Sequence, residues 1–278
     1  MTNTLGFILC LVYVFTVIGA AEGLRRWRAY SSGFTRKVIH ISVGMMSWFL
    51  PFLFTSPWPF VLACAAFMVI NLLDWRYGFF NAMQSSNRAN LGTVYFPLAA
   101  AVVALVFWER PPLMVAALMP LTWGDGLAPV VGAAYGRRFY TIHTSIRTLE
   151  GSAGFFVAGF MFTWLALWLM PGLPEITPLA AVLPSLVIMS VTTVIEAVSI
   201  WGLDNLTITA AAVVCWFNAG EGSTPLCVQN IRYCRETIGA ADGPAVLGHF
   251  YYAHLYMAQA MYLAGDEEWD RYYPQMRD

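Results

Sequence analysis

The sequence predicts an all-α membrane protein, a bundle of seven or eight transmembrane helices followed by a short polar helical tail. Hydrophobic residues make up 59% of the 278-residue chain and charged residues only 11%, whereas soluble domains carry about 25% charged residues. Several apolar runs approach the roughly 20 residues that a helix needs to cross a bilayer. Proline residues separate some of these runs and basic residues separate others, as expected for connections between membrane helices.

The apolar runs define the candidate spans in order. They cover residues 5–21, 38–55, 58–73, 93–108, 113–135, 151–170, 179–200 and a short run at 205–217. No basic region precedes the first run, which leads directly into a basic loop, so we interpret it as a retained membrane helix and not as a signal peptide.

Basic side chains predict the orientation of the bundle. The loops 22–37, 74–92 and 136–150 are rich in arginine and alternate with connections that carry few basic residues. Basic loops stay on the cytoplasmic side. We therefore expect a multi-pass protein with these loops and the turn at Asp204 in the cytoplasm, and with the N-terminus outside.

The composition changes after Phe217, which predicts a membrane domain at 1–217 and a polar appendage at 218–278. The appendage has helical character from His249 to Ala264 and, at about 60 residues, is marginal as an independent fold. The five cysteines show no CxxC spacing, so zinc and disulfide frameworks are not indicated. The formal net charge of −1 gives no sign of a nucleic-acid partner.

The stretch "LTWGDGLAPVVGAAYGRR" places Asp125 inside an apolar run. A charged group at this depth costs at least a few kcal/mol and usually marks function. The flanking Gly124 and Gly126 would let a ligand or a second backbone approach, and Pro129 is expected to interrupt the helix beside a cavity. Asp125 is suited to hold Mg²⁺, which prefers oxygen ligands and substrate phosphates. The alternative is a carboxylate near the membrane surface that contacts water.

The second span opens with "RKVIHISVG", in which Lys37, His40 and Gly44 share one helix face. The basic residues could instead be ordinary membrane anchors, and His40 could be a hydrogen-bonded core histidine. "NRANLGTVYFPLAA", before the fourth span, offers either a helix cap or a polar pocket.

Two later stretches carry further candidates. In "HTSIRTLEGSAGF", Arg147, Glu150 and Gly151 stand at a helix start, where backbone N–H groups and an arginine attract phosphate. The alternative there is a capped helix with a local salt bridge. In "EAVSIWGLDNLTI", Asp204 and Asn205 form a turn, for which both residue types have a local preference.

The predicted topology gathers these candidates at the cytoplasmic face of a hydrophobic bundle. Basic side chains and helix starts bind phosphate, carboxylates bind Mg²⁺, and the bundle dissolves a lipid. The reaction class indicated is phosphoryl or nucleotidyl transfer between a cytosolic nucleotide and a membrane lipid.

Five stretches resemble, in order, motifs of the polyprenol kinases: "RKVIHISVG", "GTVYFPL", "GDGLAPVVGAAYG", "RTLEGSAGF" and "WGLDNLTI". That family includes dolichol kinases, phytol kinases and CTP-dependent diacylglycerol kinases, and it is related to the phosphatidate cytidylyltransferases. The resemblance covers roughly residues 30–217. It implies transfer of the terminal phosphate of CTP to the hydroxyl of a membrane isoprenoid alcohol or a similar lipid.

The resemblance also implies roles for single residues. The expected catalytic residues are Lys37, His40, Asp125 and Asp204. Asp125 and Asp204 would hold Mg²⁺, and His40 or a carboxylate would accept the proton of the alcohol. The expected nucleotide-binding residues are Gly124, Gly126, Arg147, Glu150, Gly151 and Asn205. The family often has lysine where this chain has Arg147, and the sequence contains no P-loop.

Two other functions remain open from the sequence. A CDP-lipid synthase would use the same nucleotide and metal but release pyrophosphate. A non-enzymatic membrane carrier would also place carboxylates in broken helices. The segment 249–278 is similar to one helical repeat of the prenyltransferase and squalene-cyclase proteins, and one such repeat cannot close a toroid.

Overall fold

The computed structural model describes residues 3–78, 91–142, 145–199 and 202–218. The chain separates into two compact units, Met1–Val213 and Val214–Asp278. The predicted helix 249–264 and the resemblance of the tail to a helical repeat lie outside the described residues.

The described chain is mostly helical, and the predicted all-α membrane fold is confirmed. Within the described residues, four helical segments are long and apolar enough to cross a membrane: α1 (Asn3–Arg28), α4 (Trp58–Tyr77), the continuous run Pro111–Tyr135, and α8 (Leu149–Leu169). The shorter apolar helices are α5 (Gly92–Phe107) and α9 (Val182–Val198). The other helices are α2 (Ser32–Met45), η1 (Met46–Trp48), α3 (Leu50–Leu53) and α10 (Asp204–Asn218). The number of spans stays a prediction.

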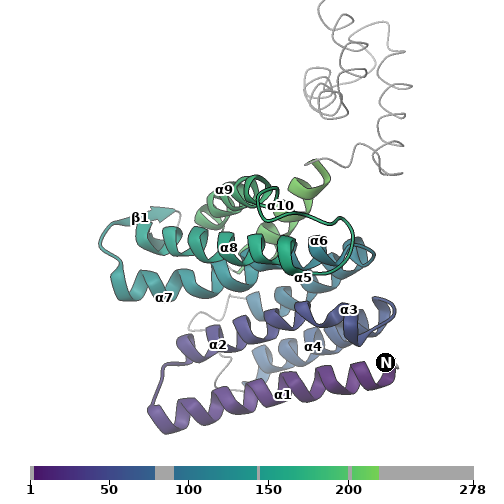
Figure 1. Ribbon diagram of the computed structural model, residues 1–278. Helices are drawn as coiled ribbons and strands as arrows, with labels where there is room; N and C mark the ends of the chain where they lie inside the picture. The colour runs from purple at the N-terminus through teal and green to yellow at the C-terminus, as the bar shows by residue number, and fades with distance from the viewer. Residues whose placement is uncertain (1–2, 79–90, 143–144, 200–201, 219–278) are drawn as a thin grey trace, which may run out of the picture. The chain divides into compact units, whose positions relative to one another are not determined.

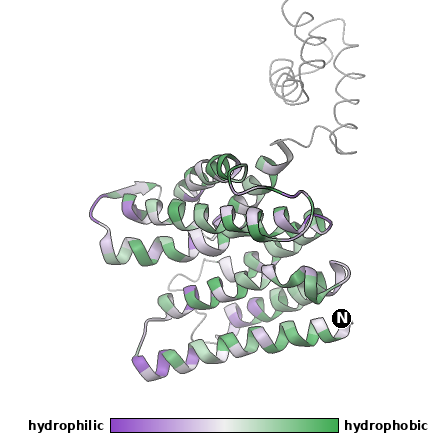
Figure 2. Ribbon diagram, viewed as in Figure 1, coloured by the Kyte–Doolittle hydropathy of each residue, from purple (hydrophilic) through white to green (hydrophobic). Residues whose placement is uncertain are grey.

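The helices of the first unit pack in neighbouring pairs, with α1 against α2, α4 against α5, and α8 against the run Pro111–Tyr135. Figure 1 shows that the C-terminal end of α1, the start of α2 and the strand β1 lie at the same end of this unit. Hydrophobic residues run through most of the helices, and the end of α1 at Arg25–Arg28 is hydrophilic (Figure 2). We call this the basic end.

The structure differs from the predicted span 38–55 in two places: the helix begins earlier, and the span is divided near Pro51. Ser31 caps α2 by accepting a hydrogen bond from the backbone N–H of Phe34, so the helix begins earlier than predicted. Further along, Pro51 lies in the first turn of α3. A helix running straight through Pro51 would lose one backbone hydrogen bond and bring the proline ring against a carbonyl.

The run Pro111–Tyr135 consists of α6 (Pro111–Met119), the π-helical turn η2 (Pro120–Asp125) and α7 (Gly126–Tyr135). The break was expected at Pro129, but that residue lies inside the continuous helix α7. The irregular turn begins at Pro120, whose backbone nitrogen cannot donate a hydrogen bond. Single wide turns of this kind occur frequently at functional sites, and this one ends at Asp125.

A two-stranded sheet lies within the predicted loop 136–150. The strands β1 (Phe139–Ile142) and β2 (Ser145–Thr148) are antiparallel and place Tyr140 opposite Arg147. Thr148 then caps α8 by accepting the backbone N–H of Gly151 at 3.0 Å. The hairpin therefore fixes where Arg147 lies relative to the start of α8.

A buried apolar cluster joins the helices that carry the later candidate residues. It contains Ala99, Leu121, Ala128, Phe155, Met189 and Ile208, from α5, η2, α7, α8, α9 and α10. Close packing of such side chains restricts relative movement of the helices. The cluster thus positions η2, with Asp125, relative to the start of α10, with Asp204.

Candidate active site

Lys37 and Asp125 form a buried ion pair between α2 and η2. The Lys37 ammonium donates hydrogen bonds to Oδ2 of Asp125 at 2.7 Å and to the backbone oxygen of the same residue at 2.8 Å. The two side chains are only 13% and 11% exposed. An isolated buried carboxylate would be costly, and the paired ammonium offsets much of that cost.

His40 lies one turn after Lys37 on α2 and faces the same part of η2. Its Nε2 lies 2.7 Å from the backbone oxygen of Leu121 and 3.5 Å from Oδ2 of Asp125. A carbonyl oxygen only accepts hydrogen bonds, so this contact requires a proton on Nε2. In the neutral imidazole, Nδ1 is then the nitrogen that can accept a proton.

Asp204 brings a second carboxylate to this region, from outside the four helical segments long enough to span a membrane. Burial raises the pKa of the Asp204 carboxyl, and the negative charge of Asp125 acts in the same direction, while Lys37 and Arg147 act against it. The neighbouring Asn205 donates its side-chain N–H groups to Asp204 at 3.0 Å and to the backbone oxygen of Gly202 at 3.1 Å. Two carboxylates that repel each other in this way favour a cation between them.

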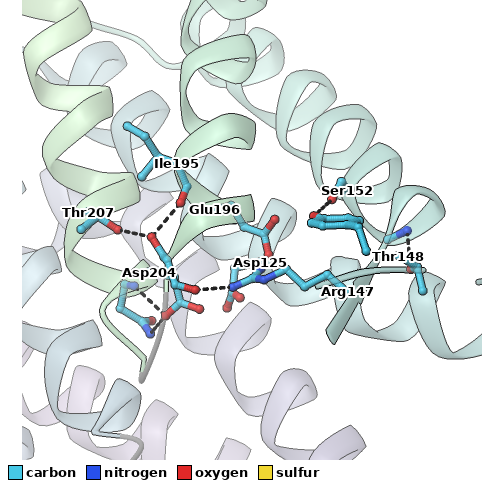
Figure 3. A network of polar contacts seen from close by, with 12 residues as sticks. Asp125, Arg147, Thr148, Ser152, Ile195, Glu196, Asp204 and Thr207 are labelled. Atoms are coloured by element: carbon cyan, nitrogen blue, oxygen red, sulfur yellow. Dashed lines mark hydrogen bonds and ion pairs between the residues drawn. The ribbon is translucent and has the colours of Figure 1, made fainter. Parts of the chain in front are cut away.

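Arg147 forms an ion pair with Glu196 near the end of α9, and it also donates a hydrogen bond to the backbone oxygen of Ser199 at 2.8 Å. Figure 3 shows Arg147 and Glu196 close to Asp125 and Asp204. Within the described part of the chain, Nε of Arg147 and Oε2 of Glu196 are buried without a hydrogen-bond partner. The pair therefore keeps one donor and one acceptor for a further ligand.

Glu150 does not form the local salt bridge with Arg147 that the sequence left open. Its carboxylate accepts the backbone N–H groups of Arg137 and Arg138, at 3.1 and 3.2 Å. Through these two hydrogen bonds Glu150 holds the connection between α7 and β1 against the start of α8.

The three glycines expected to bind nucleotide fit closely against other parts of the protein. A Cβ atom on Gly124 would lie 3.0 Å from the ring of Phe155, and one on Gly126 would lie 2.5 Å from Cγ1 of Ile41. The N–H of Gly151 is bound to Thr148. The space beside Gly124 and Gly126 is thus filled by side chains of α8 and α2, so these glycines permit close helix packing.

A cavity of about 160 Å³ lies between α1, α2, α4, α5 and η2. One part has polar and charged lining: Arg36, Lys37, His40, Asn71, Thr93, Thr122, Asp125, Asp204 and Asn205. The rest is mainly apolar: Cys10, Val14, Ile18, Ile39, Val43, Met46, Phe60, Ala63, Cys64, Phe67, Phe96, Pro97, Ala100 and Leu118, with Gly44, Ser47 and Gly92. Five of the predicted site residues line this cavity: Lys37, His40, Asp125, Asp204 and Asn205. The other five do not line it: Gly124, Gly126, Arg147, Glu150 and Gly151.

Asn71 on α4 was not singled out from the sequence. It is 8% exposed, and its side chain donates a hydrogen bond to the backbone oxygen of Thr93 at 2.7 Å, near the start of α5. The available signal was an amide inside the apolar run 58–73. A polar side chain at that depth needs a partner, and its neighbour proves to be the polar part of the cavity.

The polar lining offers the kinds of side chain that bind magnesium and phosphate. Among the described residues no three His, Cys, Asp or Glu side chains are grouped as a complete metal site. Mg²⁺ usually takes only one or two carboxylates and completes its shell with substrate phosphates and water. Asp125 and Asp204 supply two carboxylates, and Arg36 and Lys37 supply positive charge for phosphates.

The fold and the cavity define a helical membrane protein with a charged, phosphate-compatible site beside an apolar chamber. Sequence comparison finds relatives that are named as kinases of isoprenoid alcohols. The chain is 28% identical over 211 residues to a phytol kinase of Synechocystis sp., covering 75% of this chain and 89% of the relative. It is 26% identical over 172 residues to a probable chloroplastic phytol kinase of Triticum aestivum, covering 58% and 57% of the two chains. A chloroplastic farnesol kinase of Arabidopsis thaliana is 21% identical over 173 residues, covering 58% and 56%.

The predicted resemblance to the polyprenol kinases is confirmed by these relatives. The chain spans most of the cyanobacterial relative but little more than half the length of the plant proteins. No family model and no solved structure matches it.

Proposed function

We propose that this protein is a lipid-alcohol kinase that transfers the terminal phosphate of CTP to the hydroxyl of an isoprenoid alcohol. The observation that carries the proposal is the single cavity in which Lys37, Asp125 and Asp204 meet a largely apolar chamber. A charged phosphate donor and a hydrophobic alcohol acceptor require a polar and an apolar environment next to each other. The relatives named as phytol kinases and as a farnesol kinase support the same reaction.

In this proposal Asp125 and Asp204 would hold Mg²⁺, which would offset the negative charge of the nucleotide's terminal phosphates. Lys37 and Arg36 line the same polar part and offset the remaining phosphate charge. Arg147 lies just outside the cavity lining, and its Nε donor has no partner among the described residues. Positioning and electrostatic stabilisation supply most of the catalysis in phosphoryl transfer.

The alcohol oxygen attacks the terminal phosphorus, forming one P–O bond while the bond to the bridging oxygen breaks and CDP leaves. We assign acceptance of the hydroxyl proton to Nδ1 of His40, because the Leu121 carbonyl keeps the proton on Nε2. The imidazolium that results is stabilised by the carboxylate of Asp125, 3.5 Å from Nε2. Asp125 thereby also favours proton transfer to His40.

The multi-pass topology and a cytoplasmic active site belong to the same proposal. Lys37 and Arg147 come from segments at the basic end, where the end of α1, the start of α2 and the hairpin lie together. Basic connections stay cytoplasmic, which is the side where CTP is available. Reporter fusions within 136–150 test this: periplasmic or lumenal activity of the reporter would contradict the assignment.

The reaction is tested with isolated membranes, Mg²⁺ and CTP carrying label on the γ-phosphate. Label is expected on phytol or farnesol and is expected to be absent when Asp125→Asn replaces the wild type. Label released as pyrophosphate would instead identify a CDP-lipid synthase. Equal rates with ATP and CTP would remove the assigned donor while leaving the kinase reaction in place.

A further inference from the structure

We propose that the apolar chamber holds the isoprenoid chain of the substrate and that Phe60 and Ala63, on α4, limit the length of that chain. This inference rests on the proposed function, which it extends from the reacting hydroxyl to the hydrocarbon. The occupant is a single isoprenoid chain of the farnesol-to-phytol class.

The order of lining residues along three helices gives the direction of the chamber. On α4 the polar Asn71 and the apolar Phe60 both line it, and helical rise places them about 16 Å apart along the axis. On α1 the lining extends from Ile18 back to Cys10, about 12 Å. On α5 the lining runs from Thr93, bound by Asn71, to Ala100. All three helices thus describe a chamber that extends away from the polar part.

The far part of this chamber is lined by buried side chains. We call Cys10, Met46, Phe60 and Ala63 the floor residues; their exposed fractions are 1%, 8%, 5% and 3%. The Ser47 hydroxyl is the polar side-chain group that lines the same region. A hydrocarbon is favoured there, because each buried methylene contributes about 0.8 kcal/mol.

The shape of the chamber favours one chain over two. Its apolar lining follows one direction along α1, α4 and α5, which suits a single extended chain better than the paired acyl chains of diacylglycerol. A dolichol, with many more isoprene units than phytol, would meet the floor residues long before its chain was buried. Protein interiors resist such overfilling, so we expect a sharp fall in rate beyond the length that the chamber accepts.

The test measures kcat/KM for geraniol, farnesol, phytol and a longer polyprenol. Phe60→Ala deepens the chamber and is expected to raise the ratio of long-chain to farnesol activity about tenfold or more. Ala63→Phe fills it and is expected to lower the phytol-to-geraniol ratio by a similar factor, the range typical of one or two methylene groups in a pocket. Phe60→Leu replaces Phe60→Ala if the latter is not expressed.

Leu62→Ala is the matched control, because Leu62 lies on the same helix but is 65% exposed. Its length profile should equal that of the wild type. Unchanged profiles in active Phe60 and Ala63 variants would overturn the proposal, as would an equal shift in the control.

A second measurement separates this inference from the proposed function. Without CTP, phytol should raise the thermal unfolding temperature of the detergent-solubilised wild type but not that of Ala63→Phe. Stabilisation by phytol without phosphorylation of any alcohol would leave the chamber correct and the kinase assignment wrong. Phosphorylation with no difference in length profile or stabilisation between wild type and variants would leave the kinase correct and the chamber assignment wrong.

Discussion

The ammonium of Lys37 lies 2.7 Å from Oδ2 of Asp125, although the two residues are 88 positions apart in the chain. The pair joins helix α2 to the π-helical turn η2. It explains how an aspartate is accommodated in so apolar a segment. It also brings a cation, a carboxylate and the His40 imidazole to the same wall of the cavity.

Replacing Asp125 by asparagine is expected to abolish detectable phosphate transfer while the protein still inserts into membranes. The substitution keeps the shape of the side chain but removes the charge that we assign to metal binding and to stabilising protonated His40. The measurement is transfer of label from CTP, normalised to the amount of protein in the membrane. Glu175→Gln, at an exposed position between α8 and α9, is the control; normal turnover of Asp125→Asn would refute the assignment.

Lys37→Met is expected to lower the free energy of unfolding by about 3–5 kcal/mol, because the buried carboxylate of Asp125 loses its partner. The double variant Lys37→Met with Asp125→Asn should be more stable than Lys37→Met alone, since no charge remains unpaired. Thermal unfolding in detergent measures both effects. Additive destabilisation in the double variant would show that the two residues are not energetically coupled.

Arg147→Lys is expected to keep part of the activity but to raise KM for CTP several-fold. Lysine keeps the positive charge but cannot reproduce the guanidinium contacts to Glu196 and to the Ser199 carbonyl. Arg147→Met should be worse in both activity and stability, because Glu196 would then be buried without its cation. Unchanged nucleotide kinetics in both variants would limit Arg147 to a structural role.

Gly126→Ala is expected to reduce activity through packing alone. The added methyl group would lie 2.5 Å from Cγ1 of Ile41, and relieving that overlap would move α2 away from η2 at a cost of about 1–3 kcal/mol. Because α2 carries Lys37 and His40, the ion pair would lengthen.

Two companion variants test that explanation of Gly126→Ala. Ile41→Ala, combined with Gly126→Ala, should restore part of the activity by removing the opposing atoms. Gly23→Ala, where nothing lies within 4 Å of the new methyl group, should be neutral or stabilising by about 0.5–1 kcal/mol. Failure of the double variant to recover would place the defect of Gly126→Ala elsewhere.

The sequence identified candidate site residues where a charged or polar side chain would be energetically costly in its apolar surroundings. Asp125, inside an apolar run, and the pair Lys37 and His40, spaced on one helix face, could be singled out for that reason. The capped helix start that the sequence left open in "HTSIRTLEGSAGF" is present, with the hydroxyl of Thr148 as the cap of α8.

Contacts between distant segments could not be read in this way. Arg147 pairs with Glu196 and not with Glu150, which is close in sequence, because the hairpin directs the Arg147 side chain toward the end of α9. The strands themselves are only four residues long and lie among basic residues that indicated a loop. The glycines beside Asp125 were expected to admit a ligand or a second backbone. The side chains of Phe155 and Ile41 approach them instead, because of the way α8 and α2 pack.

The wide turn Pro120–Asp125 makes the candidate site sensitive to the number of residues before Asp125 as well as to their chemistry. In a regular helix each residue advances the direction of its side chain by about 100°, so deleting one residue before Asp125 would swing α7 around its own axis. The candidate site residues would all remain after such a deletion, yet the Asp125 carboxylate would no longer face Lys37 on α2. A functional chain must therefore preserve the number of residues in this turn as well as Asp125 itself.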